Sequence, residues 1–198
     1  MSIRVSRRDL LKNLAIGMTA GPALSTISAQ AAEHVHHLVE QERTDAGGTG
    51  YTPKFFPPHQ DQLLRTLCEM IIPADGETGG AVEAGAPEFI DLLTSENSEY
   101  QMTLGGGLAW LDSSCVGRYS KPFLDCSASQ QKQILDLIAY RENAAKNPEL
   151  GPGVAFFSLL RDLTSDGFFT SKIGIKYLEY IGNTALAEFP GCPPLPES

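Results

Sequence analysis

Four cysteines are the residues of this 198-residue chain that are best suited to covalent chemistry. They are Cys68, Cys115, Cys126 and Cys192. Their separations match no zinc, iron–sulfur or covalent haem motif, since such sites need closely spaced cysteine pairs or C-x-x-C-H. In an oxidising compartment the four could form two disulfides, with three possible pairings. Cys115 and Cys126 close the shortest loop, and Cys68 falls on an apolar helical face that equally suits a buried thiol. Spacing alone therefore leaves the pairing open.

Histidines and carboxylates form the other candidate groups. Three histidines cluster near the N-terminus: His34, His36 and His37. If a leader were cleaved after Ala31, His34 would become the third residue, where the amine, two amides and an imidazole can bind Cu(II) or Ni(II). Any chain with histidine at position three has this property, so we assign no metal there. Asp75 and Glu77 lie in a Gly-rich loop over 74–85 but lack the regular spacing of an EF-hand. A solvated acidic loop is favoured over a calcium or acid/base site.

The remaining catalytic and cofactor motifs are missing from the sequence. The glycine clusters lack G-x-G-x-x-G spacing after a strand, and neither H-E-x-x-H nor G-x-S-x-G occurs. We therefore predict no catalytic, cofactor-binding or metal-binding residue.

The N-terminus has the organisation of an export signal. Its basic motif comprises Ser6, Arg7, Arg8, Leu10, Leu11 and Lys12. An apolar run from Leu14 to Leu24 follows, and then the small-x-small pattern of Ala29 and Ala31. This order predicts a signal peptide cleaved after Ala31, and the paired arginines indicate the twin-arginine (Tat) route. The run is too short to span a bilayer, which takes ~20 residues.

Charge excludes two classes of partner. Removing residues 1–31 takes away four basic residues and one acidic residue, which leaves 11 basic and 23 acidic residues, a net charge of −12. Nucleic acids and anionic lipids demand basic patches, so neither is an expected ligand.

Helical periodicity predominates after the leader. Residues 32–58, rich in charge, glycine and proline, predict an extended arm or linker. Apolar spacing predicts helices over 59–72, 87–93 and 104–115. A capping box of Ser127 and Gln130 predicts the start of a helix over 128–145. Another helix is expected from Pro152 through Leu163, and a last one after a Gly-containing loop at 166–171. No run alternates with period two. The expected fold is mainly α, an irregular single-domain helical bundle with long loops over 59–198, ending in a Pro-rich tail.

Several segments resemble the gluconate 2-dehydrogenase subunit 3 family. The opening resemblance lies in 67–75 (LCEMIIPAD) and 87–91 (PEFID); the closing resemblance lies in 156–164, 166–171, Gly174 and 180–183. The similarity covers about residues 59–193.

This resemblance implies a small periplasmic subunit of a membrane-associated sugar or sugar-acid dehydrogenase. The large partner would be a flavoprotein of the glucose-methanol-choline type that holds FAD, and a c-type cytochrome would take the electrons. The small subunit would help to mature the flavoprotein and escort it through the Tat translocase. The resemblance transfers no catalytic residue to this chain, and the substrate of the complex is not determined.

Two alternatives stay open beside this reading: a free-standing periplasmic enzyme or metal-binding protein with a site near Asp75 and Glu77, and a structural helical protein exported through Tat. For partner docking, Phe168 and Phe169 are the candidates, because the predicted loop removes them from any helix face and aromatic residues are enriched at interfaces. The competing interpretation is that these rings fill the core.

Overall fold

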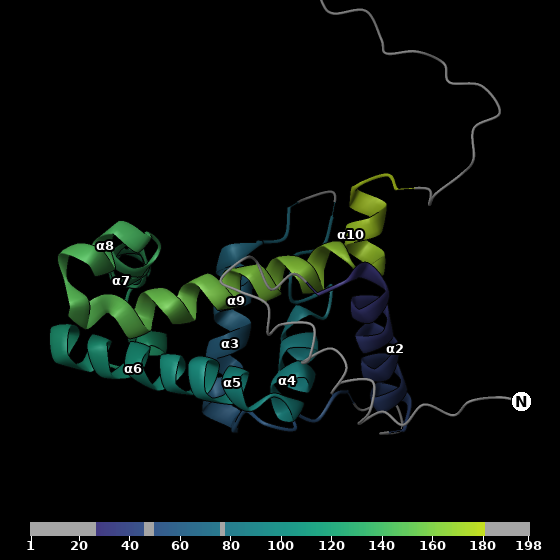
Figure 1. The fold of residues 1–198 in the computed structure, drawn as a ribbon, viewed down its shortest axis with the longest axis horizontal. Coiled ribbons are helices and arrows are strands. Elements are labelled where there is room, and N and C mark those ends of the chain that lie inside the picture. Colours follow the sequence, from purple (N-terminus) through teal and green to yellow (C-terminus); the bar gives the residue numbers. More distant parts are fainter. Residues whose placement is uncertain (1–26, 46–49, 76–77, 181–198) are drawn as a thin grey trace, which may run out of the picture.

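The computed structural model describes residues 27–45, 50–75 and 78–180, and every regular element there is helical (Figure 1). The predicted mainly-α class is confirmed, and no strand occurs within these ranges. The Tat motif, Glu77, Cys192 and the tail after Tyr180 lie outside the described residues.

The longer helices, in chain order, are α2 (Ala29–Asp45), α3 (Pro58–Ile71), α4 (Ala86–Glu96), α6 (Gly106–Tyr119), α7 (Ala128–Ile138) and α9 (Gly151–Phe169). The shorter ones are α5 (Ser98–Tyr100), α8 (Arg141–Lys146), α10 (Lys172–Tyr177), the π-helical turn η1 (Gln101–Gly105) and the 3-10 turns η2 (Phe123–Asp125) and η3 (Pro148–Leu150).

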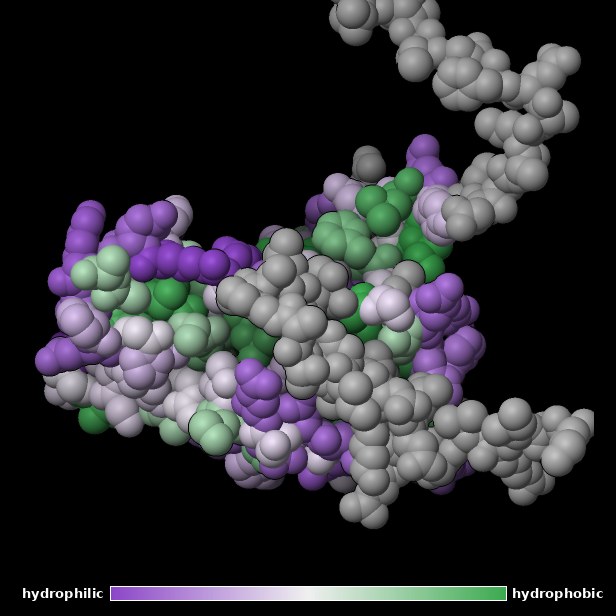
Figure 2. Space-filling view, in the orientation of Figure 1, coloured by the Kyte–Doolittle hydropathy of each residue, from purple (hydrophilic) through white to green (hydrophobic). Residues whose placement is uncertain are grey.

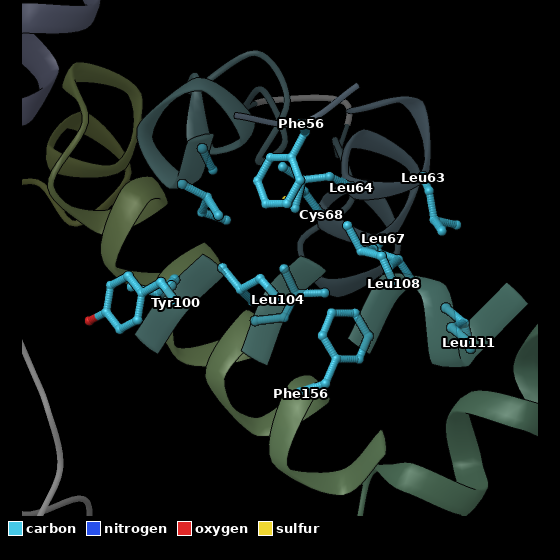
Figure 3. Close-up of a cluster of buried hydrophobic side chains, with 14 of the residues drawn as sticks. Phe56, Leu63, Leu64, Leu67, Cys68, Tyr100, Leu104, Leu108, Leu111 and Phe156 are labelled. Atoms are coloured by element: carbon cyan, nitrogen blue, oxygen red, sulfur yellow. The ribbon is translucent and has the colours of Figure 1, made fainter. Parts of the chain in front are cut away.

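Helix α9 runs along the length of the molecule and organises the core. Helices α7 and α8 lie at one end of it, and α2 and α10 lie at the other (Figure 1). Its closest partners are α4 and α6. Phe156 on α9 points into a cluster with Leu104 and Leu108, which faces leucines of α3 (Figure 3). Burial of this apolar surface is the main force that holds the helices together.

Helix α7 begins where the sequence predicts and ends earlier. Ser127 N–H donates to Gln130 Oε1 (2.9 Å) and Gln130 N–H donates to Ser127 Oγ (3.4 Å), which confirms the capping box. The predicted helix over 128–145 is interrupted after Ile138: the backbone of Tyr140 is extended (φ −119°, ψ 128°), and Asn143 Nδ2 donates to the carbonyl of Leu137 in the last turn of α7 (3.0 Å). A separate helix, α8, then begins at Arg141.

Residues 32–45 of the predicted arm are helical rather than extended. Ala32, Val35, Leu38 and Val39 of α2 are all buried. Their spacing of three and four residues makes an apolar stripe that packs mainly on α4. The charged residues around this stripe made it hard to recognise in the sequence. Residues 50–57 of the predicted arm are irregular.

Two glycines allow α6 and α9 to approach each other. A Cβ built on Gly107 would lie 2.2 Å from Cγ of Phe156. A Cβ on Gly153 of α9 would lie 2.4 Å from the ring of Trp110 on α6. Gly107, which weakens α6 as an isolated helix, is therefore needed for its packing against α9.

Candidate functional site

The acidic loop around Asp75 has the contacts of a turn. Asp75 Oδ1 accepts from the backbone N–H of Thr78 (2.6 Å) and from its hydroxyl (2.8 Å). Farther along, Gly80 N–H donates to Glu83 Oε2 (2.8 Å). Within the described ranges, no three His, Cys, Asp or Glu side chains gather in a way that could hold a metal ion. These contacts therefore favour a loop-closing role for Asp75.

Asp91 on α4 is a fully buried carboxylate that organises the preceding segment. Its Oδ2 accepts from the Tyr51 hydroxyl (2.8 Å) and Lys54 N–H (2.7 Å), and its Oδ1 accepts from the N–H groups of Phe55 (3.1 Å) and Phe56 (2.9 Å). Burial, together with the Asp91 charge and hydrogen bond, raises the pKa of Tyr51, which stays a neutral donor. The four bonds compensate the desolvation of Asp91 and fix residues 51–56 on α4.

Glu88, three residues earlier on α4, is the centre of a charge network between three helices. Its side chain is 6% exposed, and its Oε1 receives Arg43 of α2 (3.2 Å) and Arg65 of α3 (3.0 Å). Arg65 also binds Asp61 (2.9 Å). The other oxygen, Oε2, is buried and has no hydrogen-bond partner among the described residues. The network links α2 to α3 and α4, so the role of Glu88 is to position these helices.

The clustered histidines separate into different environments. His36 stacks on Phe89 with ring centroids 5.0 Å apart, and its Nε2 lies 3.0 Å from Thr170 Oγ1. Burial lowers the pKa of His36, so it is neutral at pH 7. His37 is exposed and faces Glu33 at 3.9 Å. His36 and His37 thus have different partners, although both lie on α2.

The three described cysteines also lie in two separate places. Cys68 is buried on α3, its Sγ lies 3.6 Å from Thr164 Oγ1 and burial raises its pKa to about 12. Cys115 and Cys126 are buried next to each other, away from Cys68. Cys68, Cys115 and Cys126 are all free thiols. The alternative of a buried core thiol for Cys68 agrees with these contacts.

Phe168 and Phe169 occupy the last turn of α9, so the loop predicted for them is wrong. Phe168 is 3% exposed and packs edge-on against Phe169 (5.1 Å) and Tyr177 (6.2 Å). It belongs to the interior, which removes it as an interface anchor. Phe169 is 39% exposed and stays a candidate.

An exposed hydrophobic surface lies beside Phe169. We define the α10 surface by its large apolar side chains, each 39–54% exposed: Phe169, Ile175, Tyr177, Leu178 and Tyr180. These are more than half of the large exposed apolar side chains in the described ranges, within twelve positions. Figure 2 shows hydrophobic residues gathered over α10, where the described chain ends. Ile175 and Leu178 were missed in the sequence because their exposure depends on how α10 leaves α9.

Comparison with protein families agrees with the sequence resemblance. The family model described as gluconate 2-dehydrogenase subunit 3 matches residues 58–191. The chain belongs to this family. No curated protein and no solved structure matches it. Membership supports an accessory subunit in a complex with a dehydrogenase catalytic subunit.

The site features map onto the matched region of this subunit 3 chain. The match begins at the first residue of α3 and includes Glu88, Asp91 and the α10 surface. Helix α2 precedes it, although Arg43 reaches Glu88. Among the described helices, none has the length and apolar character to cross a membrane.

The predicted cleavage site coincides with the first turn of α2. Ala31 N–H donates to Ser28 Oγ (3.3 Å), Ala32 is fully buried, and the N–H of Ile27 bonds to Asp166 on α9. Cleavage after Ala31, which stays a prediction, would remove Ser28 and Ile27 and shorten α2 by one turn.

Proposed function

We propose that this chain is a non-catalytic small subunit and an export and maturation escort of a periplasmic, FAD-dependent sugar or sugar-acid dehydrogenase. The observation that carries the proposal is the combination of family membership with a twin-arginine leader on a chain without a recognisable cofactor motif. Tat carries folded proteins, so such a leader is explained if a folded, FAD-loaded partner of the glucose-methanol-choline type is exported together with this chain. A c-type cytochrome would then receive the electrons.

The buried carboxylates support a structural role rather than catalysis. Asp91 accepts four hydrogen bonds from residues 51–56, and Glu88 is engaged by Arg43 and Arg65. A general acid or base must reach a proton of the substrate. Side chains enclosed among α2, α3 and α4 are badly placed for that task.

The α10 surface is the proposed docking site for the flavoprotein. Tyrosines are enriched among interface anchors, and a contiguous exposed hydrophobic patch marks an interaction site. Lys172 and Lys176 lie between these residues and add positive charge to a chain that is acidic as a whole. The sequence suggested the pair Phe168 and Phe169 for docking, and of the two only Phe169 remains a candidate.

A double substitution in the leader tests the escort role. Arg7→Lys with Arg8→Lys should retain both this chain and the flavoprotein in the cytoplasm, because the paired arginines direct both proteins to the Tat translocase. Arg4→Lys, also in the leader but outside the pair, is the matched control and should leave export unchanged. Fractionation followed by dehydrogenase assay of each compartment measures the outcome. Normal periplasmic dehydrogenase activity in the double variant contradicts the proposal.

A further inference from the structure

Cys115 and Cys126 are brought together by the way the chain reverses after α6. Cys115 lies near the C-terminal end of α6, and Ser120, with φ of 57°, ends that helix in the left-handed region. The turn η2 follows, and Cys126 comes directly after it, before the capping residue of α7. The ten intervening residues thus fold back on α6.

The two thiols are in contact. The side chain of Cys115 is hydrogen-bonded to that of Cys126, and the Cys126 thiol also lies 3.8 Å from the carbonyl oxygen of Lys121. Cys115 is fully buried, whereas Cys126 is 8% exposed. Of the pair, Cys126 is the sulfur that an external reagent meets first.

We propose that Cys115 and Cys126 are a preformed dithiol pair that closes into a disulfide when the exported chain meets a protein disulfide. This assignment rests on the proposed function for the oxidising compartment. A protein that crosses the membrane folded can form a bond without unfolding only between cysteines that its fold has already brought together. Cys68 is excluded because it packs against Thr164, in the core between α3 and α9.

The step balances by thiol–disulfide exchange. The Cys126 thiolate attacks one sulfur of an exported protein's disulfide, which gives a mixed disulfide and releases one thiolate of that protein. The Cys115 thiolate then attacks the Cys126 sulfur and displaces the other. The two protons lost by Cys115 and Cys126 are taken up by the two released thiolates, and two electrons reduce the donor's disulfide to a dithiol. Burial raises the pKa of the Cys115 thiol, so little of it is thiolate at neutral pH.

The product would join the end of α6 to the start of α7 through a short loop. Because the two side chains are already hydrogen-bonded to each other, closure does not require the chain to unfold. The bond would stabilise the subunit after export without being needed for folding in the cytoplasm, where thiols are kept reduced.

The test begins with the reduced, folded chain and oxidised glutathione as the probe. After alkylation, digestion at Arg118 and at glutamates places Cys68, Cys115 and Cys126 on three different peptides. We expect a cross-linked peptide pair that joins Cys115 to Cys126. Cys126→Ala should abolish it and leave Cys115 alkylated, whereas the matched control Cys68→Ala should keep it. Stable glutathione adducts on Cys115 or Cys126, or a cross-link from either to Cys68, would overturn the proposal.

A second arm maps the chain recovered from cells. A Cys115–Cys126 cross-link in periplasmic chain, with both thiols alkylated in cytoplasmic chain, supports the proposal. Reduced thiols in chain that fractionation places in the periplasm overturn it. If no chain reaches the periplasm, the escort role fails instead, and the glutathione arm alone decides the pairing.

Discussion

Adding one methyl group at Gly107 tests the packing of α6 against α9, and the neighbouring glycine supplies the control. A Cβ at Gly107 would lie between 2.2 and 2.4 Å from three carbon atoms of Phe156, which is fully buried. A Cβ at Gly106, one residue earlier in the same helix, meets nothing within 4 Å. The two alanine variants therefore share their helix propensity and differ in steric conflict.

The magnitude follows from the contact distances. Carbon atoms pack best at about 3.5–4.0 Å, so the Phe156 ring or α9 itself must move by more than about 1 Å in Gly107→Ala. Overpacking of a dense core costs about 1–3 kcal/mol, and this displacement belongs at the upper end. Alanine gains up to about 1 kcal/mol over glycine in a helix interior. Gly106→Ala should thus be stabilised by up to about 1 kcal/mol, and Gly107→Ala should unfold about 3 kcal/mol more easily than Gly106→Ala.

Urea unfolding followed by far-ultraviolet circular dichroism measures both free energies of unfolding. Equal stabilities of the two glycine variants, within about 0.5 kcal/mol, would refute the close approach of α6 and α9.

Three further outcomes are expected. Asp91→Asn should lower the free energy of unfolding by about 3 kcal/mol in urea titrations, because its amide group would face donors that now meet a carboxylate; an unchanged midpoint would contradict this. Burial, with the nearby Asp162 charge, raises the pKa of Asp166 from 3.8 to about 6. The folded state therefore holds this proton more tightly than the unfolded state does. The free energy of unfolding should fall by about 1 kcal/mol as the pH rises from about 4 to about 6, a value discounted for the partial exposure of Asp166. Asp166→Asn should remove that slope, and an identical pH profile would count against it. Ile175→Ala with Leu178→Ala should weaken flavoprotein co-purification, with an affinity loss of about tenfold, and should leave the melting temperature unchanged. Met102→Ala, at a residue 79% exposed outside the α10 surface, should change neither the co-purification nor the melting temperature.

Local patterns in the sequence indicated most of the helices and the family. The apolar stripe of α3 and the capping box of α7 involve residues within four positions of each other, so their physics can be recognised without a tertiary structure. The segments matched by the family are likewise contiguous. The leader also depends on local order alone, and it stays a prediction.

Tertiary structure decided what depends on contacts between distant residues. Asp91 is compensated by donors 35 to 40 positions earlier in the chain. Phe168 is interior because α9 continues to Phe169 and α10 packs against it. Helix α2 has a partner only once α4 is folded, so its short apolar stripe was mistaken for part of an arm. The choice of Cys115 and Cys126 as a pair also required the reversal of the chain after α6, because spacing alone allowed three connectivities.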